Sequence, residues 1–227
     1  MGDLSSVFVI GGCGLLGHHI VKYLLESGDA MRLTVFDISI KNNRYDDHKV
    51  EYIRDSITSR EDVLSALKKT KAKVIINTAS SDPLVPVPRL LEEVNITGTQ
   101  TVLDCAMECG MRILYTSTSE VVTKKIGEKL VLKANGQNGL LTTAIRLCTI
   151  FGEGGQVLTK QMVEMAQGGR ARYHVGDGKN LYDFIYARNA AEGHVLAAKK
   201  LLEASRANES IPQELRVDRE GRVAAVM

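Results

Sequence analysis

The segment VIGGCGLLG, residues 9–17, decides how the rest of this chain is interpreted. Its glycines fit two spacings of one motif, Gly12-x-Gly14-x-x-Gly17 and Gly11-x-x-Gly14-x-x-Gly17. Small residues at these positions let a backbone turn approach a pyrophosphate group, and the N-terminus of a following helix supplies N–H donors. The segment therefore predicts a dinucleotide-binding turn.

The surroundings of the turn favour the same interpretation. SVFVIG (6–11) has the pattern of a strand and residues 15–28 that of a helix, while Asp37 ends the next strand twenty residues after Gly17. A carboxylate there would accept hydrogen bonds from ribose hydroxyls and repel a 2′-phosphate, which favours NAD over NADP, although Lys41 offers a flexible cation nearby. The alternatives are a glycine-rich turn without a ligand and a solvated strand-end carboxylate. The residues expected to contact the cofactor here are Gly11, Gly12, Cys13, Gly14, Leu15, Leu16, Gly17 and Asp37.

Strand and helix patterns alternate along the whole chain. Strands are expected at 6–11, 31–37, 49–55, 72–80, 111–119 and 139–147. Helices are expected at 15–28, 59–70, 88–110, 124–136 and 155–169, and a short strand and then a helix within 180–207. This alternation predicts an α/β fold, a doubly wound parallel sheet in the order 3-2-1-4-5-6. One domain is expected over 1–207, including a small C-terminal lobe, with 208–227 as a loosely ordered tail.

Two further strand ends are candidates for cofactor contact, because ligands of such sheets bind at the carboxyl ends of the strands. Asp55 ends the third strand, where a short polar side chain can meet an adenine. NTAS (77–80) ends the fourth, where Ala79 leaves room beside a nicotinamide ribose. Each residue alone is equally consistent with an ordinary strand terminus.

The composition excludes several classes of protein. The 227 residues are 44% hydrophobic and 25% charged, with a net charge of +2, which gives no reason to expect nucleic acid as a partner. No apolar run approaches the ~18 residues that a membrane span needs. The four cysteines lack disulfide-framework spacing, and Cys105 and Cys109 lack a second pair at zinc spacing. Reduced thiols inside a cell and no metal site are therefore expected.

Several longer segments carry a family resemblance. They are IGGCGLLGHHIVKYLLESG, VFDIS, NTAS, VNITGTQTVLDCA, ILYTSTSEVV, EKLVLKANG with GLLTTAIRL, IFGEG and GDGKNLYDFIYARNAAEGHVLAA. Through them the chain resembles the extended short-chain dehydrogenase/reductase superfamily, more narrowly the 3β-hydroxysteroid dehydrogenase family and its fungal sterol-4α-carboxylate 3-dehydrogenase (decarboxylating) type. The resemblance runs from about residue 6 to residue 200.

The resemblance implies an NAD-dependent oxidation at the CH–OH group of a sterol-like or other hydrophobic alcohol. It assigns Asn95 to support of the active-site region, Thr118 to hydrogen bonding with the substrate oxygen, and Lys124 to the nicotinamide ribose. It also implies a homodimer through helices 88–110 and 124–136, and a location in the cytoplasm or at the cytoplasmic face of the endoplasmic reticulum.

The chain departs from the family pattern at the fifth strand's end. Family members carry a loop there that delivers the Tyr of Tyr-x-x-x-Lys, but here Val122 leads directly to Thr123 and Lys124, and Glu120 stands where the Tyr belongs. Glu120 is the speculative replacement base, while Lys124, beside Lys125, is expected to be solvated and protonated.

Other departures concern the substrate-binding half. Leu147 replaces the family's Pro after the Arg of the sixth strand, and family members continue well beyond the position of Met227. A reduced substrate lobe is expected. Two alternatives to an active dehydrogenase remain open: a catalytically inactive NAD-binding module, and a repurposed isomerase, lyase or cyclase on the same fold.

Overall fold

The computed structural model describes residues 4–81, 87–118, 121–155, 158–169, 172, 176, 177, 179, 181–207, 214–217 and 223–226. A parallel sheet forms its centre. The strands are β1 (Ser6–Ile10), β2 (Arg32–Asp37), β3 (Val50–Arg54), β4 (Val74–Asn77), β5 (Arg112–Thr118) and β6 (Thr142–Leu147). They lie in the order β3-β2-β1-β4-β5-β6, which confirms the predicted doubly wound topology.

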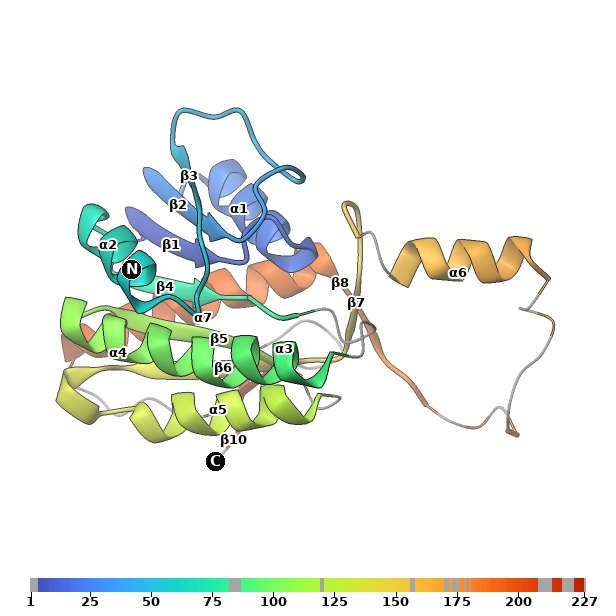
Figure 1. The fold of residues 1–227 in the computed structure, drawn as a ribbon. Helices are drawn as coiled ribbons and strands as arrows, with labels where there is room; N and C mark the ends of the chain where they lie inside the picture. Colours follow the sequence, from blue (N-terminus) through green and yellow to red (C-terminus); the bar gives the residue numbers. More distant parts are fainter. Residues whose placement is uncertain are drawn as a thin grey trace.

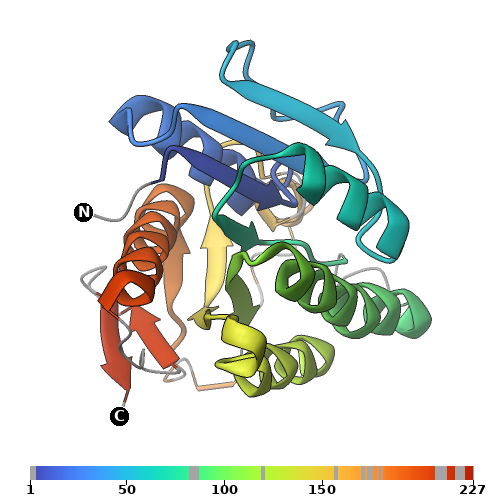
Figure 2. The same cartoon turned by 90° about the vertical axis from the view of Figure 1, so that its left-hand side faces the viewer.

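The central strands are apolar on both faces because helices cover both sides of the sheet (Figure 2). Every residue of β1 and β4 is buried. Alternate residues of β1 enter two separate cores: Val7 and Val9 pack into one, and Phe8 and Ile10 into the other.

The covering helices follow the doubly wound pattern. α1 (Leu15–Ser27) and α7 (Ala187–Ala207) pack on one face, while α2 (Arg60–Lys69), α4 (Thr99–Cys109) and α5 (Val122–Ala134) pack on the other. The expected cap of α2 is present, since the Ser59 hydroxyl accepts the Asp62 N–H at 3.4 Å. α1 ends at Gly28, which adopts the left-handed conformation with φ of 69°.

The predicted helix 88–110 is not a uniform α-helix. It consists of α3 (Pro88–Glu92), a π-helical segment (Glu93–Gly98) and α4. The π-helical segment contains Asn95, and π-helical turns concentrate at functional sites.

A small arm stands apart from the sheet. β7 (Thr149–Phe151) and β8 (Phe184–Tyr186) form a parallel pair, and α6 (Leu158–Gln167) lies beyond it, away from the main body (Figure 1). The sequence pattern predicted α6 and a short strand before α7, but not β7.

The far edge of the sheet carries two more described strands. β9 (Glu214–Val217) pairs parallel with β6, and β10 (Val223–Val226) pairs antiparallel with β9. The domain bounds 1–207 and the loose attachment of 208–227 stay predictions. Among the described residues, no helix is both long and apolar enough to cross a membrane.

Candidate functional site

The glycine-rich turn connects β1 to α1 through close backbone packing. Gly11 has φ of +75°, and its N–H donates to Phe36 O of β2 at 2.9 Å. A Cβ on Gly11 would lie 2.9 Å from the backbone nitrogen of Ala79, at the end of β4. A Cβ on Gly17 would overlap the carbonyl oxygen of Gly11. The turn therefore tolerates only hydrogen at these two positions.

The first turn of α1 leaves its N–H groups available. Gly14 is the N-cap and provides no side-chain cap, and the first turn, which includes Leu15, Leu16 and Gly17, contains no acidic residue. Unpaired N–H groups at a helix start form an anion-binding site. Cys13, next to it, is buried, and burial raises the pKa of its thiol to about 11, so the thiol stays protonated.

Asp37 lies at the end of β2, directly beside the turn. Its Oδ2 accepts the Cys13 N–H at 3.0 Å, and its Oδ1 accepts the Ser39 N–H at 3.0 Å. These two bonds orient the half-buried carboxylate over the turn. The structure thus brings together Gly11, Gly12, Cys13, Gly14 and Asp37, while Lys41 lies exposed on the following loop.

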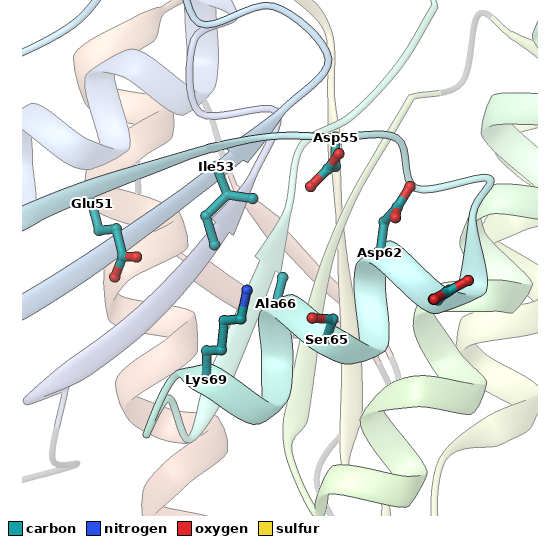
Figure 3. A pocket seen from close by; sticks show the side chains of 8 residues that line it. Glu51, Ile53, Asp55, Asp62, Ser65, Ala66 and Lys69 are labelled. Atoms are coloured by element: carbon teal, nitrogen blue, oxygen red, sulfur yellow. The ribbon is translucent and has the colours of Figure 1, made fainter.

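Asp55 follows β3, and its N–H donates to Asp37 O at 3.1 Å. It lines a cavity of about 200 Å³ between β3 and α2 (Figure 3). The lining residues are Glu51, Ile53, Asp55, Glu61, Asp62, Ser65, Ala66 and Lys69. Four of them are carboxylates, so this cavity repels anions and suits a neutral or cationic group.

The end of β4 links the turn to α5. The Thr78 hydroxyl donates to Ile10 O at 2.7 Å, and the Ala79 N–H donates to Asn77 Oδ1 at 3.1 Å. The carbonyl oxygen of Ala79 then accepts a hydrogen bond from Lys124 Nζ at 2.7 Å. Ala79 is therefore the contact between the glycine-rich side of the site and the β5–α5 side.

The expectation of a solvated Lys124 was wrong. Lys124 is only 4% exposed, and its Nζ also donates to Thr116 O at 3.0 Å and lies 4.5 Å from the centre of the Tyr115 ring. Burial lowers the pKa of Lys124 to about 7. The reason is the direction of the side chain: α5 lies against the sheet, and Lys124 faces inward while its neighbour Lys125 is exposed.

Asn95 contacts the start of α5. Its Nδ2 donates to Thr123 Oγ1 at 2.9 Å, and a Cβ on Gly127 would overlap its carbonyl oxygen. Thr118 ends β5, is half-buried, and pairs in register with Leu147, which ends the neighbouring strand β6. Glu120, the speculative base, lies outside the described residues.

The sequence patterns missed an ion pair next to this group, between the buried Glu128 and the exposed Arg146. Glu128 Oε1 lies 2.5 Å from an Arg146 guanidinium nitrogen, and Arg146 Nε also donates to the carboxylate. Burial raises the pKa of Glu128, but the hydrogen bonds from Arg146 outweigh it and the pKa lies below its ordinary range. The sequence feature that could have indicated this pair is a Glu one helical turn after Lys124. The pair fixes α5 against β6, independently of the segment that precedes α5.

Comparisons with known proteins agree with this geometry. The family described as 3-beta hydroxysteroid dehydrogenase/isomerase matches residues 8–124 and 121–215. Sterol-4-alpha-carboxylate 3-dehydrogenase, decarboxylating, of Candida albicans is 32% identical, over 89% of this chain and 67% of that protein. The human protein of the same description is 33% identical, over 85% of this chain and 57% of its own length.

Solved structures show the same fold at lower identity. WbmF of Bordetella bronchiseptica in complex with NAD+ has a TM-score of 0.73 and 22% identity, covering 86% of this chain and 69% of that one. UDP-glucose 4-epimerase of Brucella ovis in complex with NAD has a TM-score of 0.73 and 21% identity, covering 97% and 79%.

The alignment with the Candida protein also contains positions that this chain lacks. It has 236 positions but covers 89% of 227 residues, about 202, so about 34 positions lack a counterpart here. The two family matches meet at 121–124, at the start of α5. With a match that covers nearly all of the chain, and relatives above 30% identity, the chain belongs to the 3-beta hydroxysteroid dehydrogenase/isomerase family.

Proposed function

We propose that the chain is an NAD(H)-dependent oxidoreductase of the 3β-hydroxysteroid dehydrogenase type that acts on a secondary alcohol of a sterol-like molecule. One observation carries the cofactor part: Asp37 is held over the glycine-rich turn by the Cys13 N–H at 3.0 Å. In folds of this type, an acid at the end of this strand lies beside the adenosine ribose. A carboxylate there accepts hydrogen bonds from ribose hydroxyls.

The other cofactor contacts follow from the strand ends. The pyrophosphate takes the N–H groups at the start of α1, and the adenine lies towards Asp55, whose acidic cavity suits an amino group and repels phosphate. The nicotinamide ribose lies beside Ala79, whose carbonyl oxygen holds Lys124 Nζ at 2.7 Å. Asn95 supports Lys124 indirectly, because it holds Thr123 in the first turn of α5.

The chemistry at the alcohol depends on this chain's residues around β5. The bound dinucleotide supplies the hydride acceptor. Thr118 orients the alcohol oxygen, but a hydroxyl side chain does not accept a proton at neutral pH. The family's Tyr, which takes that proton, has no counterpart before Lys124, so we expect slow turnover. This same departure favours a second candidate function, an NAD-binding module without activity.

The substrate class is supported by apolar side chains around the arm. Phe151, Leu181, Tyr182 and Phe184 are large hydrophobic residues that are at least 44% exposed. They lie on or next to β7 and β8, which follow β6 beyond the strand ends of the site (Figure 1). Such a surface suits a sterol skeleton, and relatives in Candida albicans and human are described as sterol-4-alpha-carboxylate 3-dehydrogenases.

The proposal includes an assembly and a location. A homodimer would use the outer faces of residues 88–110 and 124–136, which cover one side of the sheet as neighbours. A location in the cytoplasm or at the cytoplasmic face of the endoplasmic reticulum is supported by the four free thiols.

Calorimetric titration with NAD+ and NADH tests the cofactor part, and NADH formation with 3-hydroxysteroids tests the reaction. Saturable heat with either cofactor is expected. No heat at millimolar cofactor would exclude both candidate functions. Binding without any turnover would favour the inactive module.

A further inference from the structure

Asn43 connects two segments that are far apart in the sequence. Its Nδ2 donates to the carbonyl oxygen of Cys13 at 3.0 Å and to that of Gly154 at 3.3 Å. Its backbone has φ of 52°, a conformation that Asn tolerates better than most residues. The same side chain packs so tightly on Gly154 that a Cβ there would lie 2.7 Å from Asn43 Oδ1.

Two consecutive histidines of α1 hold the same two segments. His18 Nδ1 lies 3.2 Å from Asn43 O, and His18 Nε2 lies 2.9 Å from Tyr45 Oη. Because a carbonyl only accepts, Nδ1 carries the proton and Nε2 accepts from the Tyr45 hydroxyl. Burial lowers the pKa of His18, which agrees with this neutral form.

His19 faces the other segment. Its Nε2 lies 3.0 Å from Glu153 O, to which it donates, and the Glu153 carboxylate accepts the Tyr186 hydroxyl at 2.8 Å. Tyr186 ends β8, so this contact reaches the base of the arm. We call the set Cys13, His18, His19, Asn43, Tyr45, Glu153 and Gly154 the α1 latch.

The latch fixes the peptide that leads into the pyrophosphate-binding turn. The Cys13 N–H is held by Asp37 and the Cys13 carbonyl by Asn43, while Gly14 N–H donates to Gly11 O at 3.1 Å. Removing the Asn43 amide frees the peptide between Cys13 and Gly14. The N–H groups that follow it then lose their fixed direction.

We propose that Asn43 is a positioning residue for the dinucleotide, which holds the glycine-rich turn against the turn at residues 152–155 and so makes pyrophosphate affinity depend on the base of the arm. This inference rests on the proposed NAD binding. It adds a residue that makes no contact with the cofactor, and it joins the nucleotide half of the chain to the arm.

Three variants separate the effect of the Asn43 side-chain amide from the effect of its positive φ. Asn43→Gly keeps the positive φ but loses both donated bonds, and Asn43→Asp keeps size and shape but places a carboxylate against two carbonyl oxygens. Asn138→Gly is the matched control, because Asn138 has φ of 48° in a turn far from the site. Titrations with NAD+, ADP-ribose and adenosine report on the pyrophosphate and on the nucleoside separately.

We expect the Kd of NAD+ and ADP-ribose to rise about tenfold in Asn43→Gly, as two lost hydrogen bonds imply, and further in Asn43→Asp. Adenosine affinity and the control should stay unchanged. Equal losses of affinity for adenosine and ADP-ribose would indicate general destabilisation and overturn the inference. An unchanged affinity for NAD+ in Asn43→Gly would overturn it as well.

Amide hydrogen exchange without cofactor keeps the test independent of the proposed function. Exchange at residues 13–17 and 152–155 should accelerate together in Asn43→Gly and not in Asn138→Gly. Acceleration at only one of the two segments would show that Asn43 does not couple them. Wild-type protein that binds no NAD+ would remove the proposed function, while the exchange result still decides the coupling.

Discussion

The two ends of the site differ in how the sequence encodes them. The nucleotide end is a contiguous run from β1 through the turn into α1, closed by one acid at the end of β2. The reaction end lies between Thr118, which ends β5, and Val122, which begins α5. The first brings the glycine turn, the start of α1 and Asp37 together, whereas the second has three residues between β5 and α5, where the family resemblance leads one to expect a Tyr-bearing loop. The nucleotide end is formed by the ends of the strands themselves, while the expected proton-transfer group would belong to a connecting segment.

Packing explains why α5 keeps its place without that loop. The Glu128–Arg146 pair joins α5 to β6, and Gly127 lets α5 approach Asn95 closely. Lys124 adds two hydrogen bonds to the ends of β4 and β5. These contacts all lie on the described helix, so the junction can be shortened while the fold remains.

The largest expected effect concerns turnover. A positioned general base contributes ~10²–10⁴ in rate, about 3–5 kcal/mol in activation free energy. We therefore expect NADH formation from a 3-hydroxysteroid to be slower by this factor than in a relative that has the Tyr. The measurement is kcat under saturating NAD+, with a family member that carries Tyr-x-x-x-Lys as reference.

A second measurement decides whether another residue has taken the base's role. If this chain turns over as fast as the relative, Glu120→Gln tests the residue at the Tyr position. Undiminished activity in that variant excludes Glu120 as the base. A kcat equal to that of the relative would also contradict the view that the reaction end is impaired while the nucleotide end is intact.

The next effect tests the nucleotide end. Gly17→Ala forces a Cβ into the Gly11 carbonyl oxygen, and since backbone atoms cannot move aside, we expect a loss of about 3 kcal/mol in unfolding free energy and no measurable NAD+ binding. Gly28→Ala is the control, with φ of 69° and open space around its Cβ position. It should cost about 1 kcal/mol and leave NAD+ affinity intact. If urea unfolding showed the same loss of unfolding free energy in Gly17→Ala and Gly28→Ala, close packing would not be the reason why residue 17 has to be glycine.

The sequence predicted the nucleotide end well because its signals are local. The strand, glycine turn, helix and Asp37 lie within about thirty residues, and each has a period or a spacing that hydrogen bonding dictates. The alternation of strands and helices predicted a parallel sheet, and the order of its six strands was expected from the doubly wound fold that the dinucleotide turn indicates. The helix after β4 was also found, but its π-helical segment depends on contacts with α5 that no helical period reveals.

The reaction end was harder to predict because its properties depend on distant contacts. Lys124 was expected in water, since its neighbours in sequence are polar, yet packing against Ala79 and Thr116 buries it. The latch was missed for the same reason: Asn43 and Gly154 are 111 positions apart. The available local signal was two adjacent Asn residues in a loop, a composition that favours positive φ.

A smaller effect distinguishes the two nicotinamide cofactors. A 2′-phosphate facing Asp37 leaves charged groups badly paired, which we expect to cost about 1–3 kcal/mol, so NAD+ should bind better than NADP+. Asp37→Asn removes the charge and should narrow the ratio of the two Kd values. Asp55→Asn is the control, because it lies at the adenine end and affects both cofactors alike. Equal affinities in the wild type would mean that Lys41 compensates the repulsion.

The smallest expected effect is the pH dependence of stability that the buried amine of Lys124 causes at the reaction end. Burial lowers the pKa of Lys124 to about 7 in the folded protein, whereas the pKa of a Lys in the unfolded chain stays near its ordinary value of 10.5. Between these values the unfolded chain binds a proton that the folded chain does not, so stability rises with pH. The slope from this one group is at most about 1.4 kcal/mol per pH unit, and it vanishes below pH 7, where both states are protonated.

Lys124→Met should remove that slope, and the difference between wild type and variant isolates it. The comparison belongs between pH 7 and pH 9, because above that range the buried groups Cys13 and Tyr115, whose pKa values burial raises to about 11 and about 12, make stability fall with pH instead. Lys125→Met, on the exposed side of the same turn, is the control and should leave the slope unchanged. Parallel stability curves for wild type and Lys124→Met would mean that the amine keeps its proton, with the face of the Tyr115 ring compensating for lost water. In that case the reaction end would hold a fixed positive charge. If instead stability rises with pH in the wild type and not in Lys124→Met, the amine of Lys124 gains and loses a proton near neutral pH. The reaction end then keeps one proton-transfer group although it has no Tyr, whereas binding at the nucleotide end requires no such group.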